Sequence, residues 1–165
     1  MIPGVGIRAL SLLLLLLALA ACRSTAGEQR TLQGPTALEI WTAGVILRTG
    51  REPTFDERYQ WDSQMERRIS TYLSAHPEIS NSPEVSNFTF LRQVAVGMSK
   101  EQVQLLLGLP VGAATDPAEI EKLARAYWPL IKEGQVTEAW VYPLGWRLYF
   151  SGPRVVDITQ YLERL

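Results

Sequence analysis

Hydrophobic and polar residues divide the chain into an apolar leader, a polar stretch and a longer mixed region. The leader places Arg8 before an apolar run that begins at Leu12 and ends in alanines. This order is typical of a secretory signal peptide. The run is shorter than the roughly 20 residues that a membrane-spanning helix needs. We therefore expect residues 1–21 to be a signal peptide that is removed.

The leader ends in Leu19-Ala20-Ala21-Cys22, which resembles the lipobox of bacterial lipoproteins, and Cys22 is the only cysteine. The resemblance implies cleavage before Cys22 and acylation of its thiol and new amino group. More than one acyl chain anchors a protein stably to a membrane. Arg23 stands where an aspartate would resemble an inner-membrane retention signal, which favours the outer membrane. The alternative is a plain signal peptide followed by a chance free thiol.

The residues after the cysteine are small and polar up to Pro35, and this composition predicts a flexible tether over residues 22–36. Residues 37–93 are expected to be mainly helical. The apolar stretch 37–47 is ambiguous between helix and strand, whereas Thr54 and Glu57 form a capping-box pattern ahead of a helix that Pro77 ends.

The only histidine, His76, falls at the end of that predicted helix. An imidazolium there interacts favourably with the helix dipole. A metal site normally needs several converging ligands, and no such group accompanies His76. We therefore expect a capping or surface role for His76, and we expect the protein to hold no metal and no cofactor.

A short helix is well specified from Ser99 to Gly108. Ser99 and Gln102 match a capping box, and Met98 can pack on Val103 as a hydrophobic staple. Gly108 can adopt a left-handed conformation, and Pro110 prevents continuation. So short a helix needs a packing partner for its Val and Leu residues.

Three short runs rich in β-branched and aromatic residues follow, at 136–142, 146–151 and 154–161, separated by Gly- and Pro-containing turns. They predict a three-stranded antiparallel sheet that covers the helices on one face. The expected fold class is α+β, with small helices on this sheet and an extra helical segment before them.

These residues resemble the SmpA/OmlA (BamE-like) family of outer-membrane lipoproteins, over roughly residues 94–161. The residues that carry the resemblance are Gly97, Met98, Ser99, Val103, Leu107, Gly108, Pro110, Trp140, Tyr142, Leu148, Phe150 and Val155. The resemblance implies a domain at 94–165 with two helices on a three-stranded sheet. It also implies a periplasmic, outer-membrane-anchored accessory subunit of the machinery that inserts β-barrel proteins. The helix-like insertion at 115–134 and the long stretch before residue 94 depart from the family pattern.

Aromatic residues are dense near the end of the chain, and strand alternation prevents all of them from facing one core. Most are expected in the core. The alternative is an exposed aromatic patch that binds protein or lipid, with Tyr149 as the first candidate and Trp146 and Arg147 beside it.

Composition narrows the function further. The chain carries 16 basic and 17 acidic residues, and loss of residues 1–21 removes only Arg8, which gives a net charge of −2. Without a basic stripe, nucleic-acid binding is not expected, nor is a small-molecule substrate. No nucleophile elbow or phosphate loop is present, although two acids brought together by folding would suffice for a glycan hydrolase.

We therefore expect a non-enzymatic lipoprotein of a Gram-negative bacterium, held on the periplasmic face of the outer membrane and acting by protein binding in β-barrel assembly. The alternative is a periplasmic binding or inhibitor module, or a cell-wall-associated lipoprotein, that uses the same fold.

Overall fold

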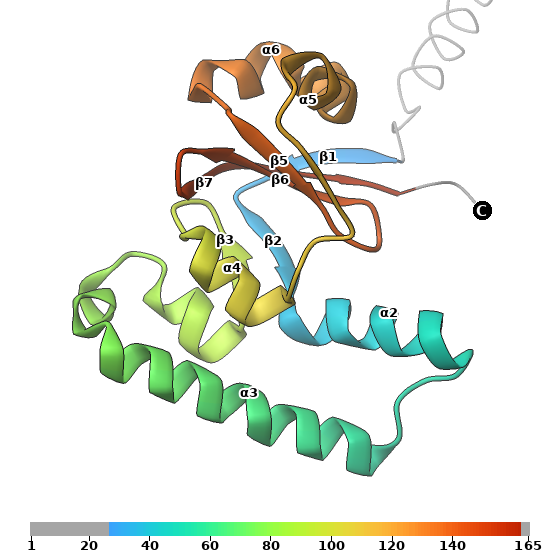
Figure 1. Cartoon of the computed structure of the whole chain (residues 1–165), viewed down its shortest axis with the longest axis vertical. Helices are drawn as coiled ribbons and strands as arrows, with labels where there is room; N and C mark the ends of the chain where they lie inside the picture. Colours follow the sequence, from blue (N-terminus) through green and yellow to red (C-terminus); the bar gives the residue numbers. More distant parts are fainter. Residues whose placement is uncertain (1–26, 163–165) are drawn as a thin grey trace, which may run out of the picture.

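The computed structural model describes residues 27–162, which form a mixed α+β fold (Figure 1). The predicted signal peptide and Cys22 lie outside the described residues. The α-helices are α2 (Ala37–Thr49), α3 (Phe55–Ala75), α4 (Lys100–Leu107), α5 (Pro117–Ala124) and α6 (Trp128–Ile131). The strands are β1 (Glu28–Thr31), β2 (Gln33–Thr36), β3 (Gln93–Ala95), β4 (Gly112–Ala114), β5 (Glu138–Val141), β6 (Trp146–Ser151) and β7 (Arg154–Tyr161).

The main sheet is antiparallel and has five strands in the order β1-β7-β6-β5-β4. Its three central strands are those predicted from the sequence, whereas the prediction of a sheet of only three was wrong. The two additional strands are at the edges, where β1 pairs with β7 and β4 pairs with β5. Edge strands are held by backbone hydrogen bonds and need no alternation of apolar side chains, so the sequence pattern did not reveal them.

Residues 28–36, predicted as part of a flexible tether, instead form β1 and β2. Strand β2 leaves the main sheet and pairs with β3 in a separate two-stranded ribbon. The physical reason is long-range: Glu28 aligns with Tyr161 across the sheet, so distant backbone groups satisfy the hydrogen bonds of this polar segment.

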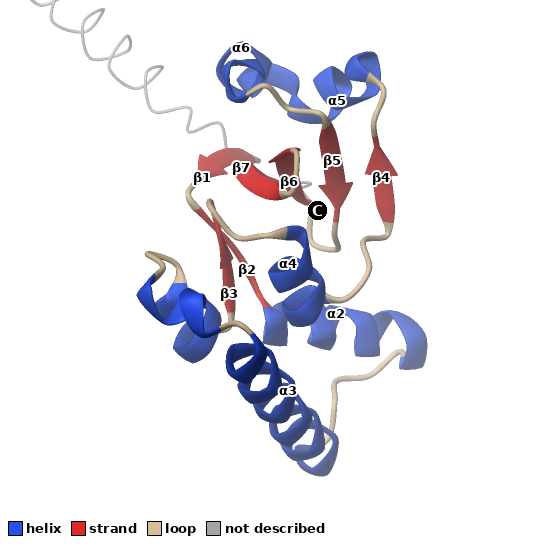
Figure 2. Ribbon diagram, turned by 60° about the vertical axis from the view of Figure 1, so that its left-hand side comes forward, coloured by secondary structure: helices blue, strands red, loops and turns tan. Residues whose placement is uncertain are grey.

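Helices cover both faces of the main sheet (Figure 2). Helices α2, α3 and α4 enclose the larger core, which contains Trp146, Leu148 and Phe150 of β6. Helices α5 and α6 enclose a smaller core with Tyr149. Because successive side chains of a strand point to opposite faces, β6 contributes to both cores and is buried through most of its length.

The predicted helix ends are largely confirmed. Ser99 and Gln102 form a capping box at α4, and Thr54 and Glu57 form another at α3. At the end of α4, Gly108 has φ 78° and ψ −164°, so it uses the positive φ open to glycine but not the left-handed helical conformation. The ambiguous stretch after Pro35 is the helix α2, which begins at a third capping box.

Candidate functional site

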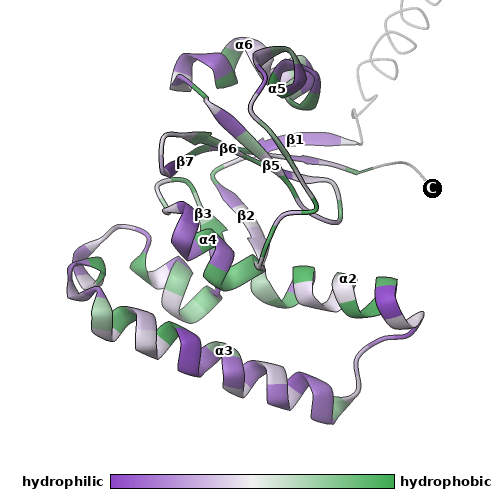
Figure 3. Cartoon of the chain, in the orientation of Figure 1, coloured by the Kyte–Doolittle hydropathy of each residue, from purple (hydrophilic) through white to green (hydrophobic). Residues whose placement is uncertain are grey.

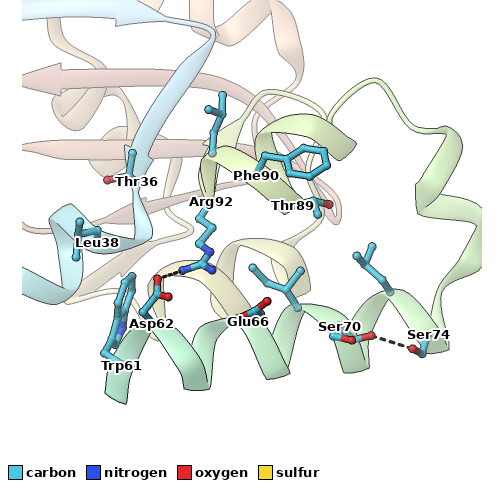
Figure 4. Close-up of a pocket in the computed structure, with 13 residues that line it drawn as sticks. Thr36, Leu38, Trp61, Asp62, Glu66, Ser70, Ser74, Thr89, Phe90 and Arg92 are labelled. Atoms are coloured by element: carbon cyan, nitrogen blue, oxygen red, sulfur yellow. Dashed lines mark hydrogen bonds and ion pairs between the residues drawn. The ribbon is translucent and has the colours of Figure 1, made fainter. Parts of the chain in front are cut away.

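A groove of about 800 Å³ lies between α3 and residues 89–92, and the start of α2 closes one end of it (Figure 4). Helix α3 supplies one wall with Asp62, Glu66, Ser70 and Ser74. These four residues are spaced by four along the helix, so they form one polar row.

The neighbouring row of α3 explains why the helix holds this position. Trp61, Met65, Ile69 and Leu73 share the same spacing of four, and Met65 and Ile69 are buried in the larger core. Trp61 and Leu73 are partly buried against the same core. The apolar row fixes α3 to the body of the protein, and the adjacent polar row is thereby turned into the groove.

The opposite wall is a single π-helical turn, η2 (Asn87–Leu91). Such turns are rare and often occur at functional sites. Within the turn Phe88 is fully buried, whereas Phe90 is 80% exposed and Leu91 is 55% exposed. The turn therefore anchors itself through one aromatic residue and presents another, with Leu91, to solvent along the groove.

Arg92 joins the two walls. Its backbone has φ 49°, an uncommon conformation for a residue other than glycine. Its carbonyl oxygen accepts a hydrogen bond of 2.8 Å from the Ala37 N–H, and its guanidinium forms an ion pair with the Asp62 carboxylate (Figure 4). These contacts hold the strained residue and fix the width of the groove.

The groove is mildly acidic and has one exposed apolar wall. Arg92 neutralises Asp62, whereas Glu66 is exposed and has no ion-pair partner in the part of the chain that the structure describes. The Thr89 hydroxyl oxygen is enclosed and likewise has no hydrogen-bond partner among residues 27–162. An apolar segment that carries a basic group would complement Phe90 and Leu91 on one wall and Glu66 on the other.

Two of the three expected partner-binding residues, Tyr149 and Trp146, are buried in the interior. Tyr149 is completely buried, and its hydroxyl lies 3.2 Å from the Thr159 hydroxyl. Burial raises the pKa of the Tyr149 phenol to about 12. Trp146 is buried in the larger core on the other face of β6. Both residues are thus in the core, as was expected of most of the aromatic residues, and the alternative of an exposed patch at Tyr149 and Trp146 is wrong. Helices α5 and α6 cover Tyr149, and the larger core encloses Trp146.

Arg147, the third expected residue, is partly buried beside Tyr161. Its guanidinium carbon lies 5.6 Å from the centre of the Tyr161 ring, and Arg125 approaches the same ring at 3.7 Å. The Nε and Nη1 groups of Arg147 are enclosed, with no hydrogen-bond partner between residues 27 and 162. The three expected residues thus do not share one surface.

His76 is the C-terminal capping residue of α3, as its sequence position indicated. Its Nδ1 lies 3.1 Å from a Glu78 carboxylate oxygen, and its ring contacts Tyr72. In the described part of the chain, no cluster of three or more metal-ligating side chains occurs. Within the same residues, no helix combines the length and the apolar character needed to cross a bilayer.

The groove was not predicted, although the sequence contains signals for it. The two rows of α3 are readable at a spacing of four, and the Asn87-Phe88-Thr89-Phe90-Leu91 segment is unusually apolar for a connection. What the sequence could not show is that Phe88 turns inward and Phe90 outward.

Comparison of the chain with protein-family models, with curated proteins and with solved structures finds no match.

Proposed function

We propose that this protein is a lipid-anchored envelope protein that acts by binding a partner protein segment in the α3 groove. The observation that carries the proposal is the juxtaposition of exposed Phe90 and Leu91 with the polar row of α3. Exposed apolar side chains in a preformed groove favour the burial of an apolar segment, and the unpaired Glu66 favours a basic residue on it.

The proposed location is the periplasmic face of the outer membrane of a Gram-negative bacterium. The support is the lipobox-like ending at Cys22 with Arg23 after it. Acyl chains on Cys22 would supply the membrane attachment.

The specific role proposed is that of an accessory factor in β-barrel assembly. Its support is the spacing of the residues from Gly97 to Val155 that resemble the SmpA/OmlA family. Several of these residues have a definite task in the fold: the Gly97 N–H donates to the Val155 carbonyl, and the Tyr142 hydroxyl donates to the Gly108 carbonyl. Because such tasks belong to the fold, the role needs a direct test.

The test is co-purification from gently solubilised membranes of a Gram-negative host that expresses the tagged full-length chain. We expect barrel-assembly subunits to be recovered with the unmodified chain, and Cys22→Ala to leave the membrane fraction. Recovery of a different periplasmic or cell-wall protein through the groove would favour the alternative binding or inhibitor role.

Two groove variants and one matched control make the test specific. Phe90→Ser and Glu66→Lys should each reduce recovery about tenfold, the effect of losing one central interface contact. Phe55→Ser is the control, because Phe55 is 82% exposed on α3 but does not line the groove. If a folded, acylated chain recovers no barrel-assembly subunit, the specific role fails. Equal recovery with the three variants would exclude the groove.

A further inference from the structure

An apolar surface lies beside the point where the described chain begins. It consists of Leu38 and Ile46 on α2 and Leu144 in the turn between β5 and β6, and these three side chains line one shallow hollow. Each is between 40% and 49% exposed. We call this hollow the leucine surface. Figure 3 shows hydrophobic residues around much of α2, unlike the predominantly polar α3.

Helix α2 therefore has more apolar surface than the protein buries. Ile40 and Val45 are buried, whereas Ile46 and Leu47 on the same helix are exposed. A helix that is apolar on several sides normally has a partner on each of them. The one carboxylate that lines the hollow, Glu39, is engaged by the Thr36 N–H and hydroxyl in the capping box.

The backbone of Leu144 gives an independent reason to expect a contact at this surface. It has φ 61°, and Gly145 after it has φ 75°. Turns with two positive φ angles are formed at least steric cost by Asn-Gly or Gly-Gly. A leucine here is both strained and half-exposed, which neither the turn nor the core requires. Its side chain is thus suited to contact something outside the described chain.

The position of Gly27 indicates what that contact is. The Leu162 N–H donates to the Gly27 carbonyl, Glu28 aligns with Tyr161, and the Tyr161 N–H donates to the Gly145 carbonyl. Neighbouring strands are about 4.8 Å apart, so Gly27 and the turn with Leu144 are on the order of 10 Å apart. The chain thus enters the domain beside the leucine surface, and Figure 1 shows both termini of the described chain near one another.

The tether is also much shorter than the sequence pattern indicated. Because β1 begins at Glu28, only the four residues 23–26 separate Cys22 from Gly27. An extended chain advances at most about 3.6 Å per residue, so the five Cα–Cα steps from Cys22 to Gly27 reach at most about 18 Å. An acylated Cys22 would hold the leucine surface close to the lipid headgroups.

We propose that the leucine surface rests in the headgroup region of the phospholipid bilayer that holds the Cys22 anchor, and thereby orients the domain on the membrane. The inference rests on the proposed acylation of Cys22. Leu38 lines both the leucine surface and the α3 groove, so one end of the groove then opens next to the bilayer. A partner segment would enter it from close to the membrane surface.

The test uses the acylated full-length chain. Cys22 is the only cysteine in the sequence, so once it is acylated no free thiol competes with an introduced cysteine for the label. Leu144→Cys is labelled with an environment-sensitive fluorophore and reconstituted in vesicles of phosphatidylethanolamine and phosphatidylglycerol that carry bromine-labelled acyl chains. Phe90→Cys is the matched control, because Phe90 is exposed on η2 outside the leucine surface. We expect quenching at position 144 to exceed that at position 90 at least threefold.

A second variant separates membrane contact from folding. Leu144→Asn suits the positive φ, so it should leave the unfolding midpoint unchanged or raised. With the fluorophore moved to Ile46→Cys, the same substitution should reduce quenching by lipid. If the acylated chain floats with the vesicles but the fluorophore is quenched equally at positions 144 and 90, this inference fails and the anchor stands. Chain that does not float would overturn both the anchor and the inference.

Discussion

The Arg30 guanidinium pairs with the Asp157 carboxylate through two nitrogens: Nε lies 3.0 Å from Oδ1, and Nη2 lies 2.8 Å from Oδ2. The Asp157 side chain is only 6% exposed, whereas that of Arg30 is 40% exposed. The pair fastens the edge strand β1 to its neighbour β7. Hydrogen bonding to Asp157 raises the pKa of Arg30 and keeps the guanidinium charged.

Replacing Arg30 should therefore weaken the attachment of β1. Arg30→Met leaves the nearly buried Asp157 carboxylate without its cation. We expect the free energy of unfolding to fall by about 1–2 kcal/mol, a range that already allows for solvent screening of the partly exposed arginine. Urea unfolding of the chain from residue 22 onward with Cys22→Ala measures this. Arg51→Met is the control, because both side chains of the Arg51–Glu57 pair are exposed, by 51% and 41%. Equal effects of the two variants would contradict the assignment.

Tyr149 should matter for stability and not for binding. Tyr149→Ala removes a completely buried aromatic side chain from the smaller core and should cost about 3–5 kcal/mol. Tyr149→Phe loses only the contact with the Thr159 hydroxyl and should cost about 1 kcal/mol. A Tyr149→Ala chain as stable as the unmodified one would show that the residue is not in a core.

The same tyrosine gives a pH dependence with a defined sign. Burial raises the pKa of Tyr149 from 10.0 to about 12. Between these values the unfolded chain has lost the phenolic proton and the folded chain retains it, so stability falls as pH rises. Tyr149→Phe should make this alkaline fall less steep. Urea midpoints between pH 9 and about 12 measure the difference, and identical slopes would count against a buried phenol.

Glu57 should titrate far below an ordinary glutamate. The Arg51 side chain and the Thr54 N–H donate hydrogen bonds to its carboxylate and lower its pKa from 4.5 to about 2. The stabilising contacts at the start of α3 are therefore complete above pH 4.5 and are lost as pH falls through about 2. Carboxyl NMR titration at low salt measures the pKa directly. Arg51→Met should move it upward, whereas an unchanged midpoint would exclude the pair.

The turn before β6 lies against the backbone of β7, and a comparison of Gly145 in this turn with Gly152 in the next turn tests that contact. A Cβ on Gly145 would lie 1.7 Å from the Tyr161 carbonyl oxygen, and φ there is 75°. Gly152 has φ 56° but nothing within 4 Å of the added atom. Gly152→Ala should cost about 1–2 kcal/mol from conformation alone. Gly145→Ala should cost clearly more, because the backbone must shift. Comparable losses in thermal unfolding would show that the turn and β7 are not packed as described.

Local rules in the sequence determined the parts of this protein that depend on neighbouring residues. The capping residues Thr54 and Ser99 begin α3 and α4 where expected, and the β-branched and aromatic runs form the three central strands. These features depend on hydrogen bonds and side-chain periods within a few residues. The lipobox-like ending at Cys22 is also a short local motif, and the cleavage and acylation that it predicts lie outside the described residues.

Only the tertiary structure decided which face of each element is covered. The sequence places Tyr149 opposite Trp146, but it does not reveal that α5 and α6 return over the second face of the sheet and bury Tyr149. The polar residues 28–31 have no pattern of a strand and become one because β7 supplies their hydrogen bonds. Phe88 points into the core and Phe90 points to solvent along the groove, and this difference likewise depends on how η2 packs against α3. The packing of η2 against α3 thus made the groove, long-range backbone pairing placed residues 28–36 in strands, and the second layer of helices buried Tyr149. The local pattern of a segment does not specify which distant segment it packs against.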